Sequence, residues 1–246
     1  MEAAVLAVWC FAVAFAGGLV GLVLGNIRLP LVVLVASTPA AGAGANIGIS
    51  GVAAGTATIA HIRAGRINWR LFAWMAPPSI VGALVGGAVS GRLPANALLA
   101  LIGVTLLYFG FDLLRPKHLE PQPPGRELDI RAAVVSGALI GVLGGLVGLI
   151  LGALRMPALL RYVGETPTRA IGTNMAVGFC VGIAGLLGHL AGGIDWTAFW
   201  IGSVASIPGA LLGARMTGLL SPRALMRSIA VVLLVAGVVM LVEAAF

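Results

Sequence analysis

Two arginines occupy matching places in the chain, each two residues before a proline. Arg28 lies in Gly25-Asn-Ile-Arg-Leu-Pro30, and Arg155 lies in Gly152-Ala-Leu-Arg-Met-Pro157. Glycine and proline favour the end of one helix and the start of the next, where backbone N–H groups are free and the helix dipole is positive. Guanidinium groups beside such helix starts favour an oxyanion. The pattern therefore predicts an anion site at the two breaks, with Asn26 inside the first.

A second explanation of the two arginines is that both side chains extend to lipid headgroups, as long cationic side chains at the ends of membrane segments commonly do. One arginine would fit that explanation well. Two arginines at equivalent positions, each followed by proline, favour the anion site.

Other polar residues follow the breaks and could complete the site. The hydroxyl and amide side chains in question are Thr38, Asn46, Thr173 and Asn174. Helix capping and hydrogen bonding between helices remain an alternative for all four. His61 and His189 are candidates for proton coupling because imidazole titrates near neutral pH, although neighbouring Trp69 and Trp196 equally favour hydrogen bonding at the membrane interface.

The composition shows which kind of element must position these residues. Of 246 residues, 60% are hydrophobic and only 9% are charged, too few for a surface that faces water on all sides. The net charge of +7 comes from single basic residues between apolar runs, which gives no nucleic-acid footprint. The length suits about eight hydrophobic segments. We therefore expect an all-α polytopic membrane protein whose partner is the lipid bilayer.

The chain is duplicated. The fourteen residues from Gly17 to Pro30 align with those from Gly144 to Pro157, and ten positions are identical. Such internal symmetry is typical of secondary transporters. We predict a first transmembrane repeat over 1–114, a cytoplasmic linker over 115–130 and a second repeat over 131–246. Each repeat has about four hydrophobic segments, with broken or re-entrant helices at the two Gly-x-x-Arg-x-Pro motifs; whether the short segments 30–37 and 157–163 cross the membrane stays open.

The basic residues indicate the orientation of the repeats. If each repeat crosses an even number of times, seven basic residues lie inside and eight outside, which is no bias. If each crosses an odd number of times, twelve lie inside and only Arg92 lies outside, with Arg28 and Arg155 at the breaks. We therefore expect inverted repeats, with both termini outside and the linker inside.

Little in the sequence suggests an enzyme, a metal centre or a cofactor. Ser50 lacks the glycine spacing of a Gly-x-Ser-x-Gly nucleophile motif, and there is no His-Glu-x-x-His motif. Two cysteines, Cys10 and Cys180, are too few for a zinc site and are interpreted as core residues. The spacing of Gly17, Gly21 and Gly25, repeated at 144, 148 and 152, predicts a packing ridge between helices.

The ordered pieces together resemble the TauE/SafE family of sulfite and organosulfonate exporters. The pieces are Gly21 to Pro30 and Gly148 to Pro157, Ala170-Ile-Gly-Thr-Asn174, His189 followed by Gly192-Gly-Ile-Asp-Trp196, and Ile207-Pro-Gly-Ala210 with Gly213-Ala214. The resemblance implies a bacterial inner-membrane, multi-pass transporter that exports small sulfur-containing oxyanions such as sulfite or sulfoacetate. Many members have three glycines in the break, where this chain keeps only Gly25 and Gly152.

We expect alternating access around an anion site between the two repeats. A passive anion channel on the same scaffold is the alternative, and a membrane scaffold without transport is disfavoured because it has no need of a duplicated cationic break. Glycine ridges serve packing within or between subunits, so homo-oligomerisation stays open.

Overall fold

The computed structural model describes residues 1–88, 94–115, 128–147, 149–190 and 193–245. Every regular element in these ranges is helical, and the all-α prediction is confirmed. Among the described residues, five helices are long and apolar enough to cross a membrane, namely α1, α5, α8, α9 and α10. Most of the predicted linker, together with Arg92, Lys117, Arg126, Gly148 and Gly192, lies outside the described residues.

The two halves contain corresponding helices in the same order. The first half consists of α1 (Glu2–Val20), α2 (Gly25–Val35), α3 (Pro39–Arg63), α4 (Trp69–Ala88) and α5 (Ala95–Leu113). The second consists of α6 (Ile130–Val147), α7 (Gly152–Pro157), the π-helix η2 (Ala158–Val163), α8 (Pro167–His189), α9 (Trp196–Met216) and α10 (Pro222–Ala245). α2 and the α7–η2 pair therefore occupy equivalent places in their halves.

Contacts between the halves are reciprocal. The first helix of each half packs along the fourth helix of the other, so that α1 lies on α9 and α6 lies on α4. α3 packs on its counterpart α8, and α5 on its counterpart α10. Such an exchange is what a duplicated sequence would produce, so it supports the prediction of two repeats.

Equivalent glycines allow these helices to approach closely. A Cβ added to Gly209 or Gly213 of α9 would collide with the carbonyl oxygens of Phe11 and Phe15 on α1. The equivalent residues of α4, 127 positions earlier, are Gly82 and Gly86, and they meet the carbonyls of Ala138 and Val142 on α6 in the same way. Close backbone packing of this kind is a common source of stability between membrane helices.

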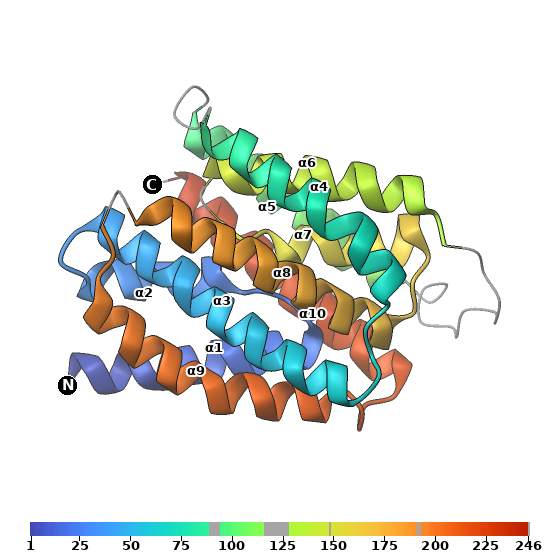
Figure 1. The fold of residues 1–246 in the computed structure, drawn as a ribbon, viewed down its shortest axis with the longest axis horizontal. Helices are drawn as coiled ribbons and strands as arrows, with labels where there is room; N and C mark the ends of the chain where they lie inside the picture. Colours follow the sequence, from blue (N-terminus) through green and yellow to red (C-terminus); the bar gives the residue numbers. More distant parts are fainter. Residues whose placement is uncertain (89–93, 116–127, 148, 191–192, 246) are drawn as a thin grey trace.

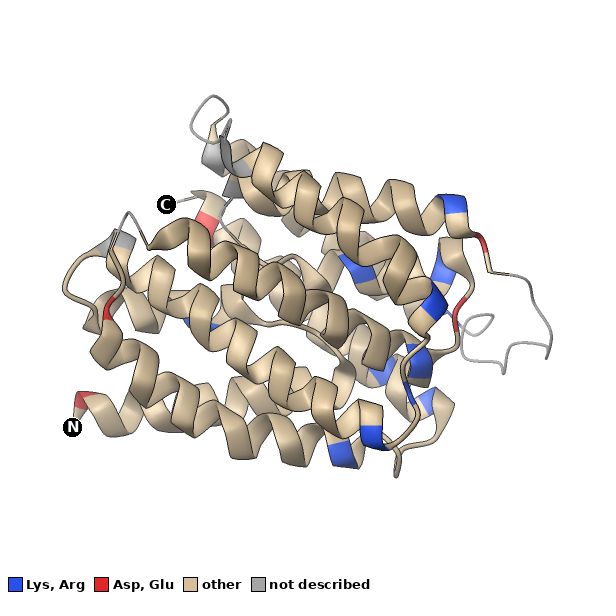
Figure 2. Cartoon of the chain, in the orientation of Figure 1, with Lys and Arg blue, Asp and Glu red and all other residues tan. Residues whose placement is uncertain are grey.

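The two ends of the bundle differ in charge. Both termini lie at one end, and the linker leaves from the other (Figure 1). Lys and Arg gather at the linker end (Figure 2). Since cationic loops favour the cytoplasmic side, this distribution supports a cytoplasmic linker.

The helix breaks fall earlier than the sequence suggested. α1 ends at Val20, because Gly21 adopts a left-handed backbone with φ of 70° and caps the helix. α2 then starts at Gly25 and not at Pro30, so Arg28 lies in its first turn and Pro30 inside the helix. The expected ridge of Gly17, Gly21 and Gly25 is therefore wrong, since these residues do not share one helix.

Proline acts differently in the second half. Pro157 is the last residue of α7, and the chain continues as the π-helix η2. Proline has no N–H to donate to the carbonyl four residues earlier, which loosens the α-helical ladder at that point. Single π turns of this kind occur frequently at functional sites.

Candidate anion site

The two helix breaks meet in the middle of the structure. Each is closed by the same backbone hydrogen bond, from Leu22 N–H to Gly17 O at 3.0 Å and from Leu149 N–H to Gly144 O at 2.9 Å. The Asn174 side chain joins the breaks, because its Nδ2 donates to Gly21 O at 2.6 Å and to Gly152 O at 3.0 Å. One amide on α8 thus holds both interruptions together.

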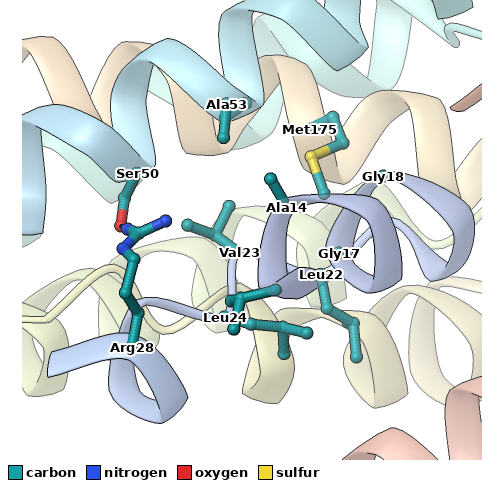
Figure 3. Close-up of a pocket in the computed structure, with 12 residues that line it drawn as sticks. Ala14, Gly17, Gly18, Leu22, Val23, Leu24, Arg28, Ser50, Ala53 and Met175 are labelled. Carbon is teal, nitrogen blue, oxygen red and sulfur yellow. Dashed lines mark hydrogen bonds between the residues drawn. The ribbon is translucent and has the colours of Figure 1, made fainter. Parts of the chain in front are cut away.

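Arg28 is buried beside the first break, with only 2% of its surface exposed. Its Nε donates to Asn46 Oδ1, and its Nη2 donates to Asn46 O, both at 3.0 Å. Nη2 also lies 2.5 Å from Ser50 Oγ on the same helix. Figure 3 shows the guanidinium reaching from α2 to Ser50 on α3, with one nitrogen directed towards the space beside Val23.

Arg155 is the equivalent residue beside the second break and is 1% exposed. Its Nη1 donates to Asn174 Oδ1 at 3.1 Å, as Arg28 donates to Asn46. Its Nε is buried and has no hydrogen-bond partner among the described residues. The position equivalent to Ser50 is Gly178, so the second half lacks that hydroxyl.

Neither arginine has a carboxylate within ion-pair distance in the described part of the chain. The ion pairs found there join Asp112 to Arg115 and to Arg161. A buried guanidinium without a counter-charge is costly unless an anion or a set of polar groups balances it. Amide and hydroxyl oxygens supply only part of that balance here.

A small cavity of about 20 Å³ adjoins Arg28. Its polar side chains are Arg28 and Ser50, and the rest of its lining is apolar and comes from α1, the first break, α3 and α8. In this conformation it has room for about one water molecule. A larger anion would therefore require the surrounding helices to move apart.

The structure brings together only some of the residues expected at this site. Arg28 with Asn46, and Arg155 with Asn174, form two equivalent pairs. Asn26 is buried in the first turn of α2, and its Nδ2 has no partner among the described residues.

Two expected site residues take up other roles. Thr38 is exposed and caps α3 by accepting a hydrogen bond from Ala41 N–H at 3.2 Å. Thr173 is buried and accepts one from Asn68 N–H at 3.0 Å. The capping and interhelical alternatives therefore describe these two residues.

Ser50 is the site residue that sequence reasoning missed. Its sequence motif only argues against a Gly-x-Ser-x-Gly nucleophile and does not mark it as a binding residue. Its position four residues after Asn46 places both on one face of α3, and this spacing was the available signal.

The two histidines have different surroundings. His61 is fully buried, and neither ring nitrogen has a hydrogen-bond partner in the described residues. His189 is partly exposed, and its Nδ1 lies 2.9 Å from Gly185 O of its own helix. Their part in proton coupling stays a prediction.

Of the two cysteines, Cys10 lies near enough to Arg28 for the two side chains to interact electrostatically. Cys10 is buried against Gly202 of α9, and Cys180 is partly buried on α8. Both are free, and the described residues contain no cluster of His, Cys, Asp or Glu suited to a metal ion.

Comparison with known proteins identifies the family. A family model described as "Sulfite exporter TauE/SafE" matches residues 6–240. The chain belongs to the TauE/SafE family. It is also similar to three proteins of Bacillus subtilis (strain 168), each named a probable membrane transporter protein. YjnA is 27% identical over 91% of this chain and 94% of its own length, YtnM is 26% identical over 80% and 67%, and YunE is 21% identical over 65% and 64%.

No solved structure matches this TauE/SafE chain. Its match to the family model covers both helix breaks and both arginine pairs. It is therefore a multi-pass membrane protein of a transporter family, and the arginine pairs are the candidate site for its cargo.

Proposed function

We propose that this TauE/SafE protein exports a small sulfur-containing oxyanion, such as sulfite or a sulfoacetate-like organosulfonate, across the bacterial inner membrane. The proposal rests on one observation above all: two fully buried arginines, each held by an asparagine, have no carboxylate partner among the described residues. A buried cation of this kind is suited to bind an anion that arrives and leaves. The family and its relatives' names support transport as the activity.

Alternating access fits the dimensions of the site. The cavity beside Arg28 is too narrow for a sulfur oxyanion in the present conformation. Binding must therefore be accompanied by movement of the helices, and the two reciprocally packed halves offer a rigid-body way to move. A passive channel would instead need a continuous open path.

Transport by arginine variants tests the proposal. Purified protein in proteoliposomes should show saturable sulfite or sulfoacetate counterflow. Arg28→Gln and Arg155→Gln should each lower it roughly 10- to 100-fold, because each loses charge-assisted hydrogen bonds to the anion. Arg28→Lys should also be impaired, since lysine cannot donate to Asn46 in the same forked geometry.

Arg223→Gln is the matched control, because this arginine is exposed near the start of α10. It should transport and insert into the membrane as the unmodified protein does. Normal transport by both Arg28→Gln and Arg155→Gln would refute the anion site. Unsaturable electrogenic flux would show that the protein is a passive anion channel and not a transporter.

A further inference from the structure

One face of α3 leads from the arginine site towards the cytoplasmic end of the bundle. Asn46, Ser50, Ala54, Ala57 and His61 follow one another at intervals of three or four residues, and all are buried. Asn46 and Ser50 hold Arg28, and Ala54 lines the cavity. His61 follows Asn46 by about 22 Å along the helix axis.

His61 lies on the cytoplasmic side of the cavity. The end of α1 at Gly18 lines the cavity and also lies beside the imidazole of His61. On the opposite side is α8, where a Cβ on Gly172 would come within 3.2 Å of the His61 Cβ. The lack of a side chain at Gly172 therefore lets α8 pack closely against His61.

The two ring nitrogens of His61 are polar atoms that the described residues do not fully satisfy. Both nitrogens are buried, and neither makes a hydrogen bond of ordinary geometry there, although a buried imidazole usually does; the backbone of Gly18 is the group that interacts with the ring. The neighbouring charged group is the Arg66 guanidinium, and no carboxylate pairs with the ring in the described chain. A neutral imidazole has one N–H donor to offer to an anion.

Arg66 continues the same series towards the surface. It lies in the turn between α3 and α4, partly exposed, and its Nη1 donates to Ala214 O at 2.8 Å. The order from the middle of the fold outward is therefore a guanidinium with a hydroxyl, an imidazole and a second guanidinium. All of these groups offer hydrogen-bond donors to an anion, and none is acidic.

His189 lacks these properties although it is the repeat counterpart of His61. It is partly exposed, and its Nδ1 is already engaged with Gly185 O. The duplicated sequence therefore places two histidines, and of these two only His61 is fully buried with neither nitrogen in a hydrogen bond of ordinary geometry to the described residues.

We propose that His61 is a second anion contact, through which the oxyanion passes between the Arg28 site and the cytoplasmic face. The neutral ring donates its N–H to the anion and replaces part of its hydration as it passes the narrow stretch between Gly18 and Gly172. This inference rests on the proposed transport function and assigns one step of it. It gives His61 a donor role and not that of a proton carrier.

Two substitutions separate the donor role from titration and from packing. His61→Gln keeps an N–H donor but cannot titrate, whereas His61→Phe keeps a ring without any donor. Sulfite counterflow in proteoliposomes and sulfite-induced thermal stabilisation in detergent are measured for both. Arg223→Gln, the exposed control of the transport test, is measured beside them.

His61→Gln should retain counterflow within about threefold, and His61→Phe should lower it roughly tenfold or more. His61→Phe should still be stabilised by sulfite to the same extent, because the Arg28 site is intact. Arg223→Gln should behave as the unmodified protein in both measurements. A His61→Phe variant that neither folds nor binds is replaced by His61→Leu, to which the same expectations apply.

Each contrary outcome points to a different failure. Normal counterflow by the variant without a donor, or equal loss in His61→Gln and His61→Phe, overturns the donor role of His61. If Arg28→Gln abolishes sulfite binding while the His61 variants transport normally, only this inference fails. If the unmodified protein transports neither sulfite nor sulfoacetate, the proposed function fails and the inference fails with it.

Discussion

At the scale of single residues, asparagine takes the place that a carboxylate would take in an ordinary buried ion pair. Asn46 and Asn174 orient Arg28 and Arg155 without neutralising them. An aspartate at either position would satisfy the guanidinium permanently and compete with an anionic substrate. The neutral amide keeps the arginine in place and leaves its charge available.

Asparagine and aspartate also distinguish two equivalent turns, each of which makes a hydrogen bond to the other half. Asn68 begins α4 and donates its Nδ2 to Glu165, while its repeat counterpart Asp195 begins α9 and accepts from Ser37 N–H at 2.9 Å. Ser37 and Glu165 are themselves repeat counterparts. The same inter-half contact is therefore made twice with donor and acceptor exchanged, which a duplicated gene must acquire after duplication.

Asp195 makes stability depend on pH. Hydrogen bonds from the N–H groups of Ala198 and Ser37 hold the pKa of the Asp195 carboxyl below its ordinary value. Its contribution to stability is therefore complete above the unfolded pKa of about 4 and is lost as pH falls through the lower folded pKa. The unfolding midpoint of the unmodified protein should exceed that of Asp195→Asn at pH 7, and the difference should shrink below about pH 4.

Thermal unfolding in detergent at both pH values measures this difference. Asp129→Asn is a suitable control, because Asp129 caps α6 from an exposed position without joining the two halves. A difference for Asp195→Asn that persists unchanged at low pH would contradict the assignment.

At the scale of helices, interruption and close packing have separate causes. α1 ends because Gly21 adopts a left-handed backbone. α2 can begin at Gly25 because glycine has no Cβ, and a Cβ there would lie only 2.7 Å from Ser50 Oγ. The long helices instead use glycine for contact with a neighbouring backbone. One residue type therefore both breaks helices and joins them, depending on where it falls.

Glycine substitution on α9 tests the packing role. In Gly213→Ala the new methyl group would collide with the carbonyl of Phe15, so α1 and α9 must move apart and stability should fall by about 1–3 kcal/mol. Gly188→Ala on α8 is the matched control, since a Cβ there meets nothing within 4 Å. The control should be neutral or gain up to about 1 kcal/mol of helix propensity.

Unfolding midpoints of the two variants in one detergent give the comparison. Equal stability of Gly213→Ala and the unmodified protein would show that the α1–α9 contact tolerates separation. The same test can be repeated with Gly86→Ala on α4, whose environment is equivalent.

At the scale of the whole molecule, the distribution of charge assigns a direction to the bundle. Both termini lie at the end opposite the linker, and Lys and Arg gather at the linker end (Figures 1 and 2). This arrangement is the one expected if each half crosses the membrane an odd number of times, counting the short broken element. The consequence is that the inner and outer approaches to the arginine site are built from equivalent but non-identical helices.

Cysteine labelling tests the direction. In a background without Cys10 and Cys180, Ala64→Cys in the α3–α4 turn and Thr197→Cys at the start of α9 are exposed at opposite ends. An impermeant maleimide added to intact cells should label Thr197→Cys and should reach Ala64→Cys only after permeabilisation. Labelling of Ala64→Cys in intact cells would contradict the predicted orientation and indicate the opposite one.

The sequence alone determined the class, the duplication and the two arginines. Low charge and long apolar runs require a membrane protein, and a repeated Gly-x-x-Arg-x-Pro motif marks both breaks because glycine and proline act through local backbone geometry. Such local effects can be read without knowing which helices are neighbours.

Tertiary structure alone decided which groups meet. The roles of Thr38 and Thr173 outside the cluster, the addition of Ser50 and the isolation of His61 depend on contacts between residues far apart in the chain. The start of α2 at Gly25 likewise depends on its fit against Asn46 and Ser50 of α3. These features arise from packing between helices, which the pattern along a single segment does not encode.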